Sequence, residues 1–153
     1  MLLHYSAKPL EFPIRSVAQI ARPDHKPRGF WVSVEGVGDS WKDWCEGEEW
    51  NVERLAFSHE IVLRPDANIL RLSTAENIDW LTKEFVAPGA PPWAYYQIDW
   101  ARVAAKWDGI IIAPYVHERR LHHETNWYYT WDCASGCIWN ARAIEQESMK
   151  VES

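Results

Sequence analysis

Gly29-Phe30-Trp31-Val32-Ser33-Val34 is the clearest strand signal in the chain. The stretch combines aromatic and β-branched residues, and Pro27 before it and Gly36 after it mark its ends, which predicts a β-strand. A short helix should follow, because Asp39 or Ser40 can cap it and its apolar residues stand three and four positions apart. These apolar residues are Trp41, Trp44 and Cys45.

Short strands and short helices are predicted along the rest of the chain. Further strands are expected at residues 2–5, 60–64, 68–72, 110–113, 126–131 and 136–139. Strands interspersed with helices predict a mixed α+β fold. We expect one domain at residues 1–146, followed by a flexible C-terminal tail at residues 147–153.

Two longer helices have clear start signals. Residues 73–76, Ser-Thr-Ala-Glu, form a capping box that opens a helix whose inward face carries Ile78, Leu81 and Phe85. Asp99 caps a second helix, whose apolar positions continue to Trp107 at helical spacing. Residues 141–146 are expected to form a last helical turn.

The composition fits one folded domain. The chain has 153 residues, and 16 basic against 22 acidic side chains give it a formal net charge of −6. At this length a domain buries roughly 68–70% of its unfolded surface, and an aromatic content of 14% excludes a disordered chain. No apolar run approaches the roughly 20 residues that a membrane span needs, and the N-terminus does not resemble a signal peptide, so we expect a cytoplasmic protein.

Tryptophan is the compositional anomaly, with 11 copies. Trp80, Trp100 and Trp107 accompany the predicted helix faces and are expected in the core or at its margin. Five others are expected to wall a cleft: Trp31, Trp41, Trp44, Trp127 and Trp131. Indole faces of this kind suit a base, a sugar or a nicotinamide ring, and the alternative is ordinary core packing.

Several classes of site find no support in the sequence. Neither Gly-x-Ser-x-Gly nor a glycine-rich phosphate loop is present. Three cysteines make no disulfide framework, and Cys133 and Cys137 with His122 and His123 have poor spacing for zinc, so no metal is predicted. Reduced, buried thiols are expected, and a nucleophilic Cys133 has no specific support.

Charge is distributed unevenly. The acidic balance disfavours non-specific binding of nucleic acid. Residues 8–28 nevertheless hold five cations against two acids, and this segment is either a basic lip for an anion such as pyrophosphate or a solvated loop. The cations are Lys8, Arg15, Arg22, Lys26 and Arg28.

Three short motifs together resemble the ADP-ribosyltransferase superfamily. Leu3-His4-Tyr5-Ser6 is similar to its first strand, Gly29-Phe30-Trp31-Val32-Ser33 to its second, and Cys137-Ile138-Trp139-Asn140 to its closing strand. The whole chain also resembles small proteins encoded by phages of actinobacteria. The resemblance implies a single compact α+β domain with a split mixed sheet and two to three short helices.

The resemblance implies that the protein binds NAD and transfers ADP-ribose to a host protein or a nucleic acid, and the acidic net charge favours a protein. Asp132 and His4 would be catalytic, with the carboxylate stabilising the positive charge that develops on the ribose. The NAD-binding residues would be His4, Tyr5, Ser6, Trp31, Ser33, Trp41 and Trp44.

The sequence departs from the family pattern at two places. Tyr5 stands where many members have glycine, and Ser135 stands where the acid is expected, so that Asp132, or else Glu124, is the candidate carboxylate. The alternative function is therefore an inactive nucleotide- or host-protein-binding module on the same scaffold, and a sugar-binding module is a third. Each residue also has a plain structural reading: His4 as a strand-end histidine, Ser33 as a strand polar residue and Asp132 as a turn residue.

Overall fold

Six strands form one mixed sheet in the described part of the chain, residues 1–91 and 93–147 of the computed structural model. They are β1 (Leu2–Ser6), β2 (Phe30–Val34), β3 (Phe57–Ile61), β4 (Ile69–Leu72), β5 (Gly109–Ile112) and β6 (Ser135–Ile138). Their order in the sheet is β3-β1-β2-β6-β5-β4, and β4 and β5 run parallel while the other neighbours run antiparallel. The predicted single α+β domain is confirmed.

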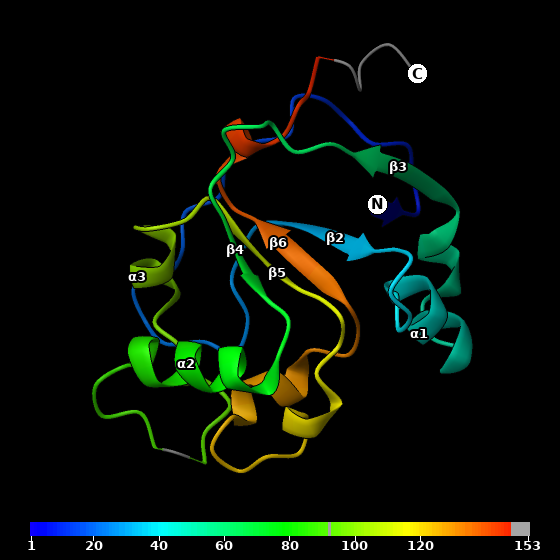
Figure 1. Cartoon of the computed structure of the whole chain (residues 1–153). Coiled ribbons are helices and arrows are strands. Elements are labelled where there is room, and N and C mark those ends of the chain that lie inside the picture. The colour runs from blue at the N-terminus through cyan, green and yellow to red at the C-terminus, as the bar shows by residue number, and fades with distance from the viewer. Residues whose placement is uncertain (92, 148–153) are drawn as a thin grey trace.

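The largest part of the core lies between the sheet and two helices, α2 (Ala75–Phe85) and α3 (Trp100–Ala104). Figure 1 shows both helices on the β4 side of the molecule, whereas α1 (Trp41–Gly47) lies beyond β2 on the other side. The predicted inward face of α2 is confirmed, because its three apolar residues are at most 3% exposed: Ile78, Leu81 and Phe85. α3 ends at Ala104, so Trp107 lies beyond it.

The opposite face of the sheet carries a second apolar cluster. Val32 of β2 and Ile138 of β6 pack there against Ile14 and Ile144, which come from the two ends of the chain. The Gln146 side chain accepts a hydrogen bond from the Ile14 backbone and donates another to it. Gln146 therefore joins the C-terminal segment to the N-terminal one. Of the tail expected at 147–153, the part after residue 147 lies outside the described residues.

Helix caps follow the sequence signals closely. Ser40 caps α1 in a complete capping box with Asp43, and Asp99 caps α3. At α2 the cap is Thr74 and the residue three positions later is Asn77, whose side chain accepts from the Ser73 backbone N–H. The helix therefore starts one residue later than expected and has a Thr74 cap without a complete capping box.

The strand predicted at 126–131 is wrong. Asn126–Thr130 form a 3₁₀ helix, in which the neighbouring side chains of Trp127 and Tyr128 are both fully buried in the same core cluster. A strand would point adjacent side chains to opposite faces of a sheet. The Thr130 hydroxyl donates to the Trp127 carbonyl and helps to close the turn.

The sheet opens between β1 and β2. β1 pairs with β3 over its whole length, from Leu2 opposite Ile61 to Ser6 opposite Phe57. It pairs with β2 only at Leu2 and Leu3, after which the two strands part. This opening matters because the predicted site residues lie on both sides of it.

Two remaining expectations concern the position of one strand and the presence of membrane-spanning helices. The strand predicted at 60–64 lies earlier, at Phe57–Ile61. In the described part of the chain, none of the helices has the length and apolar character needed to cross a bilayer.

Candidate functional site

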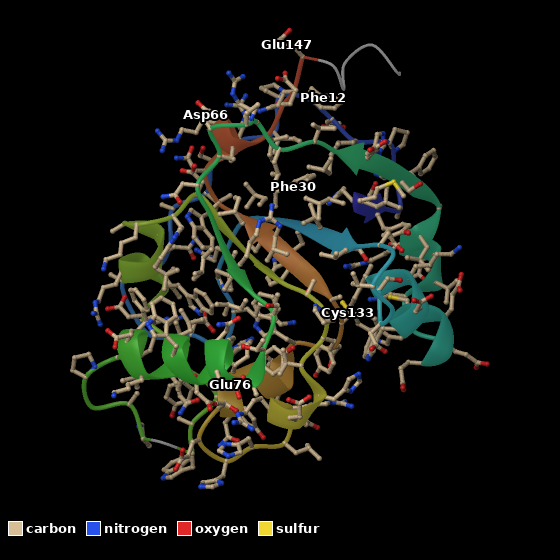
Figure 2. The ribbon with its side chains drawn as sticks, in the orientation of Figure 1. Phe12, Phe30, Asp66, Glu76, Cys133 and Glu147 are labelled. Atoms are coloured by element: carbon tan, nitrogen blue, oxygen red, sulfur yellow. The ribbon has the colours of Figure 1, made fainter. Side chains whose placement is uncertain are left out.

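A cleft of about 320 Å³ lies where β1 and β2 part. Its walls come from β1, β2, the start of α1 and the segment that leads into β6. Cys133, which lines it, is labelled in Figure 2 on the side of the sheet toward α1. Six of the predicted site residues line this one cleft: His4, Tyr5, Trp31, Ser33, Trp41 and Asp132. Ser6 and Trp44 do not, and Ser6 instead donates a hydrogen bond to the Lys8 carbonyl.

Backbone groups face the opening. The Glu35 N–H donates to the Met1 carbonyl. In an antiparallel ladder the hydrogen-bonded pairs recur every two residues. The next such pairs along β1 and β2 would be Leu3 with Ser33 and then Tyr5 with Trp31. The pairing ends at Leu3. The Tyr5 backbone therefore points into the opening, where it is available to a ligand.

The His4 side chain bonds to the Trp31 carbonyl, which would otherwise pair with the Tyr5 backbone. Its Nδ1–H donates to the Trp31 carbonyl at 2.7 Å, which leaves Nε2 as an acceptor. Its ring stacks on Phe30 with 4.1 Å between centroids, so it lies on the face of the sheet opposite to the Trp31 side chain. Burial lowers the pKa of His4, the charge of His59 acts in the same direction, and the hydrogen bond to Trp31 opposes them. A neutral imidazole thus closes the opening from the far face.

Ser33 holds the helix that carries Trp41. Its buried hydroxyl accepts from the Trp41 backbone N–H at 2.9 Å and donates to Glu35 Oε1 at 3.1 Å. The Tyr5 hydroxyl donates to the same Glu35 oxygen at 3.0 Å, and burial together with Glu35 raises the pKa of Tyr5 to about 12. Ser33 is therefore a positioning residue for Trp41. Glu35 was missed from the sequence, although its place two residues after Ser33 puts it on the same face.

Asp132 is a half-buried carboxylate in the cleft wall. Burial raises its pKa, while the charges of Lys26 and Arg120 oppose that shift and Glu48 adds to it. Within residues 1–91 and 93–147 no protein group forms a hydrogen bond or ion pair with this carboxylate. A partly buried charge without a partner is costly, so the carboxylate is poised to interact with a ligand.

Lys26 is the cation of the cleft wall. Its Nζ lies 5.6 Å from the centroid of the Trp31 ring, and burial lowers its pKa against the opposing charge of Asp132. Of the five cations in the basic segment 8–28, Lys26 is the one that lines the cleft. Arg54, which the sequence did not single out, adds a second, exposed cation.

Three of the five tryptophans expected in a cleft wall lie there: Trp31, Trp41 and Trp131. Trp31 meets Trp131 edge to face, with 5.1 Å between ring centroids. The Trp131 indole N–H is buried and has no hydrogen-bond partner in the described residues. Trp44 stacks on Trp41 at 5.4 Å instead, and Trp127 belongs to the core.

The remaining candidates do not join the site. Glu124 is exposed and pairs with His123 at 3.7 Å, so Asp132 is the carboxylate of the cleft. Cys133 lines the cleft, but burial raises its pKa to about 12, which leaves a thiol and no nucleophilic thiolate. All three cysteines are free and buried, and the described residues contain no group of three or more potential metal ligands.

A larger cavity, of about 570 Å³, lies near Asp66, Asp108 and Glu147. Asp66 and Glu147, labelled in Figure 2, mark its place at the end of the molecule where the described chain stops. Its charged groups already pair with one another: Arg142 with Asp108 at 3.2 Å, and Arg64 with Asp66 at 3.5 Å. Such pairing leaves the tryptophan-lined cleft as the better ligand site.

Comparison of the chain with protein-family models, with curated proteins and with solved structures finds no match. The function must therefore be argued from the cleft.

Proposed function

We propose that the cleft binds the nicotinamide riboside half of NAD and that the protein transfers ADP-ribose from NAD to a macromolecule. The observation that carries this proposal is the Asp132 carboxylate, which is half-buried and lies in a cleft with indole walls. It forms no hydrogen bond or ion pair within the described residues. The resemblance of the first two strands and the closing strand to the ADP-ribosyltransferase superfamily supports it.

The cleft offers suitable partners for each part of this substrate. A volume of about 320 Å³ is at the low end for small-molecule sites, which suits one nucleoside and leaves the rest of NAD outside. Indole faces suit the nicotinamide ring, and the Tyr5 backbone at the opening offers a donor and an acceptor to its carboxamide. Lys26 and Arg54 supply positive charge for the pyrophosphate.

Asp132 would do the electrostatic work of the reaction. As the bond between nicotinamide and ribose breaks, its electron pair leaves with neutral nicotinamide and the ribose carbon becomes positive. An ionised carboxylate stabilises that charge, and the acceptor then bonds to the same carbon and releases its proton to solvent. His4 lies on the far face of the opening, so it is a positioning residue here: its Nδ1–H holds the Trp31 carbonyl at 2.7 Å.

The proposed reaction has a pH dependence with a definite sign. Asp132 must be ionised, and burial raises its pKa above the ordinary value for aspartate. Activity should therefore fall on the acid side at a higher pH than an exposed aspartate would give. The three free cysteines fit a reducing compartment such as the cytoplasm, where NAD is available.

The test measures nicotinamide release from NAD, and transfer of labelled ADP-ribose to proteins and nucleic acids of a bacterial lysate. Asp132→Asn should lower both rates by about 100- to 1000-fold, the size of one preorganised electrostatic group. Asp66→Asn is the matched control, because Asp66 is exposed and lies outside the cleft. Equal rates for wild type and Asp132→Asn would overturn the assignment of the carboxylate.

Two observations favour a non-catalytic alternative. The Ser33 hydroxyl is already bonded to Trp41 and Glu35, and Ser135 stands where the family resemblance places an acid. A nucleotide- or protein-binding module would keep the cleft without the chemistry. NAD binding without nicotinamide release over several hours would establish that alternative.

A further inference from the structure

Three tryptophans form a cluster on the surface beside the cleft. Trp41 and Trp44 of α1 stack with 5.4 Å between ring centroids, and Trp50 meets both edge to face at 5.8 and 5.5 Å. Trp50 is 46% exposed, and Trp41 and Trp44 are half-buried. Within the described residues no protein group accepts a hydrogen bond from any of the three indoles. We call this cluster the tryptophan surface.

The backbone on both sides of Trp50 is held in an unusual conformation. Glu49 and Asn51 both have left-handed φ angles, +52° and +49°, a region that asparagine tolerates and glutamate enters rarely. Left-handed residues on either side of Trp50 turn the chain sharply after α1, where the Trp50 N–H donates to the Cys45 carbonyl. Backbone strain of this kind concentrates at functional sites. The position of Trp50 is therefore specified by the fold.

The same segment is strongly acidic. Residues 41–54 hold five carboxylates against two cations: Asp43, Glu46, Glu48, Glu49 and Glu53 against Lys42 and Arg54. Lys42 lies 3.8 Å from Glu46. Glu48, Glu49 and Glu53 have no ion-pair partner in the described part of the chain. The tryptophan surface thus has negative charge around it that the protein does not neutralise.

The tryptophan surface is continuous with the cleft. Trp41 belongs to both. Charges also reach across the boundary, because Asp43 and Glu46 help to raise the pKa of Tyr5, and Glu48 that of Asp132. A macromolecule bound on the tryptophan surface would therefore lie beside the group that the cleft activates.

We propose that the tryptophan surface binds a lysine- or arginine-rich segment of the protein that accepts ADP-ribose. The claim that the bound protein accepts ADP-ribose rests on the proposed function. The claim that the bound segment is basic rests on the tryptophan surface alone. Cationic side chains are attracted both to indole faces and to carboxylates. Phosphate-rich partners, nucleic acids and anionic membranes alike, are repelled by the same carboxylates.

The first experiment measures binding without NAD. The probe is a fluorescein-labelled twelve-residue peptide with six arginines, compared by anisotropy with a glutamate-rich peptide and with single-stranded DNA. The arginine peptide should bind and the other two should not, and its affinity should fall several-fold as salt rises from 50 to 300 mM because exposed charges are screened.

Two variants localise the binding. Trp50→Ala, and separately the double change Glu48→Gln with Glu49→Gln, should each weaken the arginine peptide about tenfold. The matched controls are Trp93→Ala, at an indole 68% exposed on another part of the surface, and Glu118→Gln, and neither should change the affinity. Thermal unfolding of each variant checks that the fold is kept.

The outcomes separate this inference from the proposed function. Absence of arginine-peptide binding, equal loss in Trp50→Ala and Trp93→Ala, or tighter binding of DNA would overturn the inference, even where lysate proteins are ADP-ribosylated. Specific peptide binding without nicotinamide release would instead uphold the docking surface and refute the transferase.

Discussion

Two groups of three tryptophans in this protein have similar distances between their rings and opposite surroundings. In the buried group, Trp127 lies 5.9 Å from Trp100 and 6.2 Å from Trp131, and all three are at most 2% exposed. On the tryptophan surface the corresponding distances are 5.4–5.8 Å, and Trp50 is 46% exposed.

The hydrogen bonds of the indoles show the difference most clearly. Trp100 Nε1 donates to the Asp24 carbonyl at 3.2 Å and Trp127 Nε1 to Thr82 Oγ1 at 2.8 Å, as buried donors usually do. The tryptophan surface makes no such bonds within the described residues. Trp131 stands between the two, since it is buried but its donor is unpaired and it lines the cleft.

This comparison teaches that surroundings, and not the distance between rings, separate structural tryptophans from candidate ligand-binding ones. The cleft takes Trp131 from the buried group and Trp41 from the surface group, with Trp31 in contact with Trp131. Mutations in the buried group should therefore cost much more stability than mutations on the tryptophan surface.

The largest effect on stability is expected in the buried group. Trp127→Ala removes a fully buried indole and leaves Thr82 without its donor, and should lower the free energy of unfolding by about 3–5 kcal/mol. Urea denaturation measures it. A loss below about 1 kcal/mol would mean that this group does not hold the core.

A smaller loss of stability is expected when one hydrogen bond that holds α1 or α2 is removed. Ser33→Ala removes the bond to the Trp41 N–H and should cost about 1–2 kcal/mol, with faster hydrogen exchange confined to α1. Thr74→Ala removes the cap of α2, should cost about 1 kcal/mol, and should speed exchange in α2 alone. Exchange that increases in both helices for either variant would show that the two regions are not independent.

The ionised Asp132 carboxylate should lower the stability of the folded protein. Because burial raises its pKa in the folded protein, the ionised form is less favourable folded than unfolded, and stability is lost as pH rises from the unfolded to the folded value. Asp132→Asn should therefore raise the thermal midpoint slightly at pH 7, and this gain should disappear at pH values low enough to protonate the wild-type carboxyl. A lower midpoint for Asp132→Asn at pH 7 contradicts the assigned burial.

The smallest effect on stability is expected on the tryptophan surface. Trp50→Ala should change the free energy of unfolding by no more than about 0.5 kcal/mol, as is usual for exposed side chains. Urea denaturation beside Trp127→Ala gives the direct contrast. A cost near that of Trp127→Ala would make both groups structural and would remove the distinction between them.

Local signals in the sequence predicted much of the fold. The caps at Ser40 and Asp99 and the strand at Phe30–Val34 depend on neighbouring residues, so the sequence carries them directly. Residues 126–131 were mistaken for a strand because their aromatic content suits one, whereas the demand to bury both Trp127 and Tyr128 on one side comes from the tertiary structure.

The site was predictable in part. His4 and Ser33 were found from short motifs, and Asp132 as the carboxylate nearest to the place where the family resemblance expects an acid. All three line one cleft. The engagement of Ser33 with Trp41 and Glu35, and the place of His4 on the far face, depend on where the pairing of β1 with β2 stops. No local pattern in the sequence marks the residue at which this pairing stops. Because the cleft lies at that point, its lining could not be predicted in full: Trp44 was expected there and Arg54 was missed.

Calorimetric titration with NAD tests the central claim, that the cleft between the two tryptophan groups is the ligand site. Wild type should bind one NAD per chain, Trp41→Ala should bind at least about tenfold more weakly, and Trp80→Ala, at an exposed indole outside the cleft, should bind as wild type does. No binding by wild type, or equal affinity for wild type and Trp41→Ala, would contradict the account.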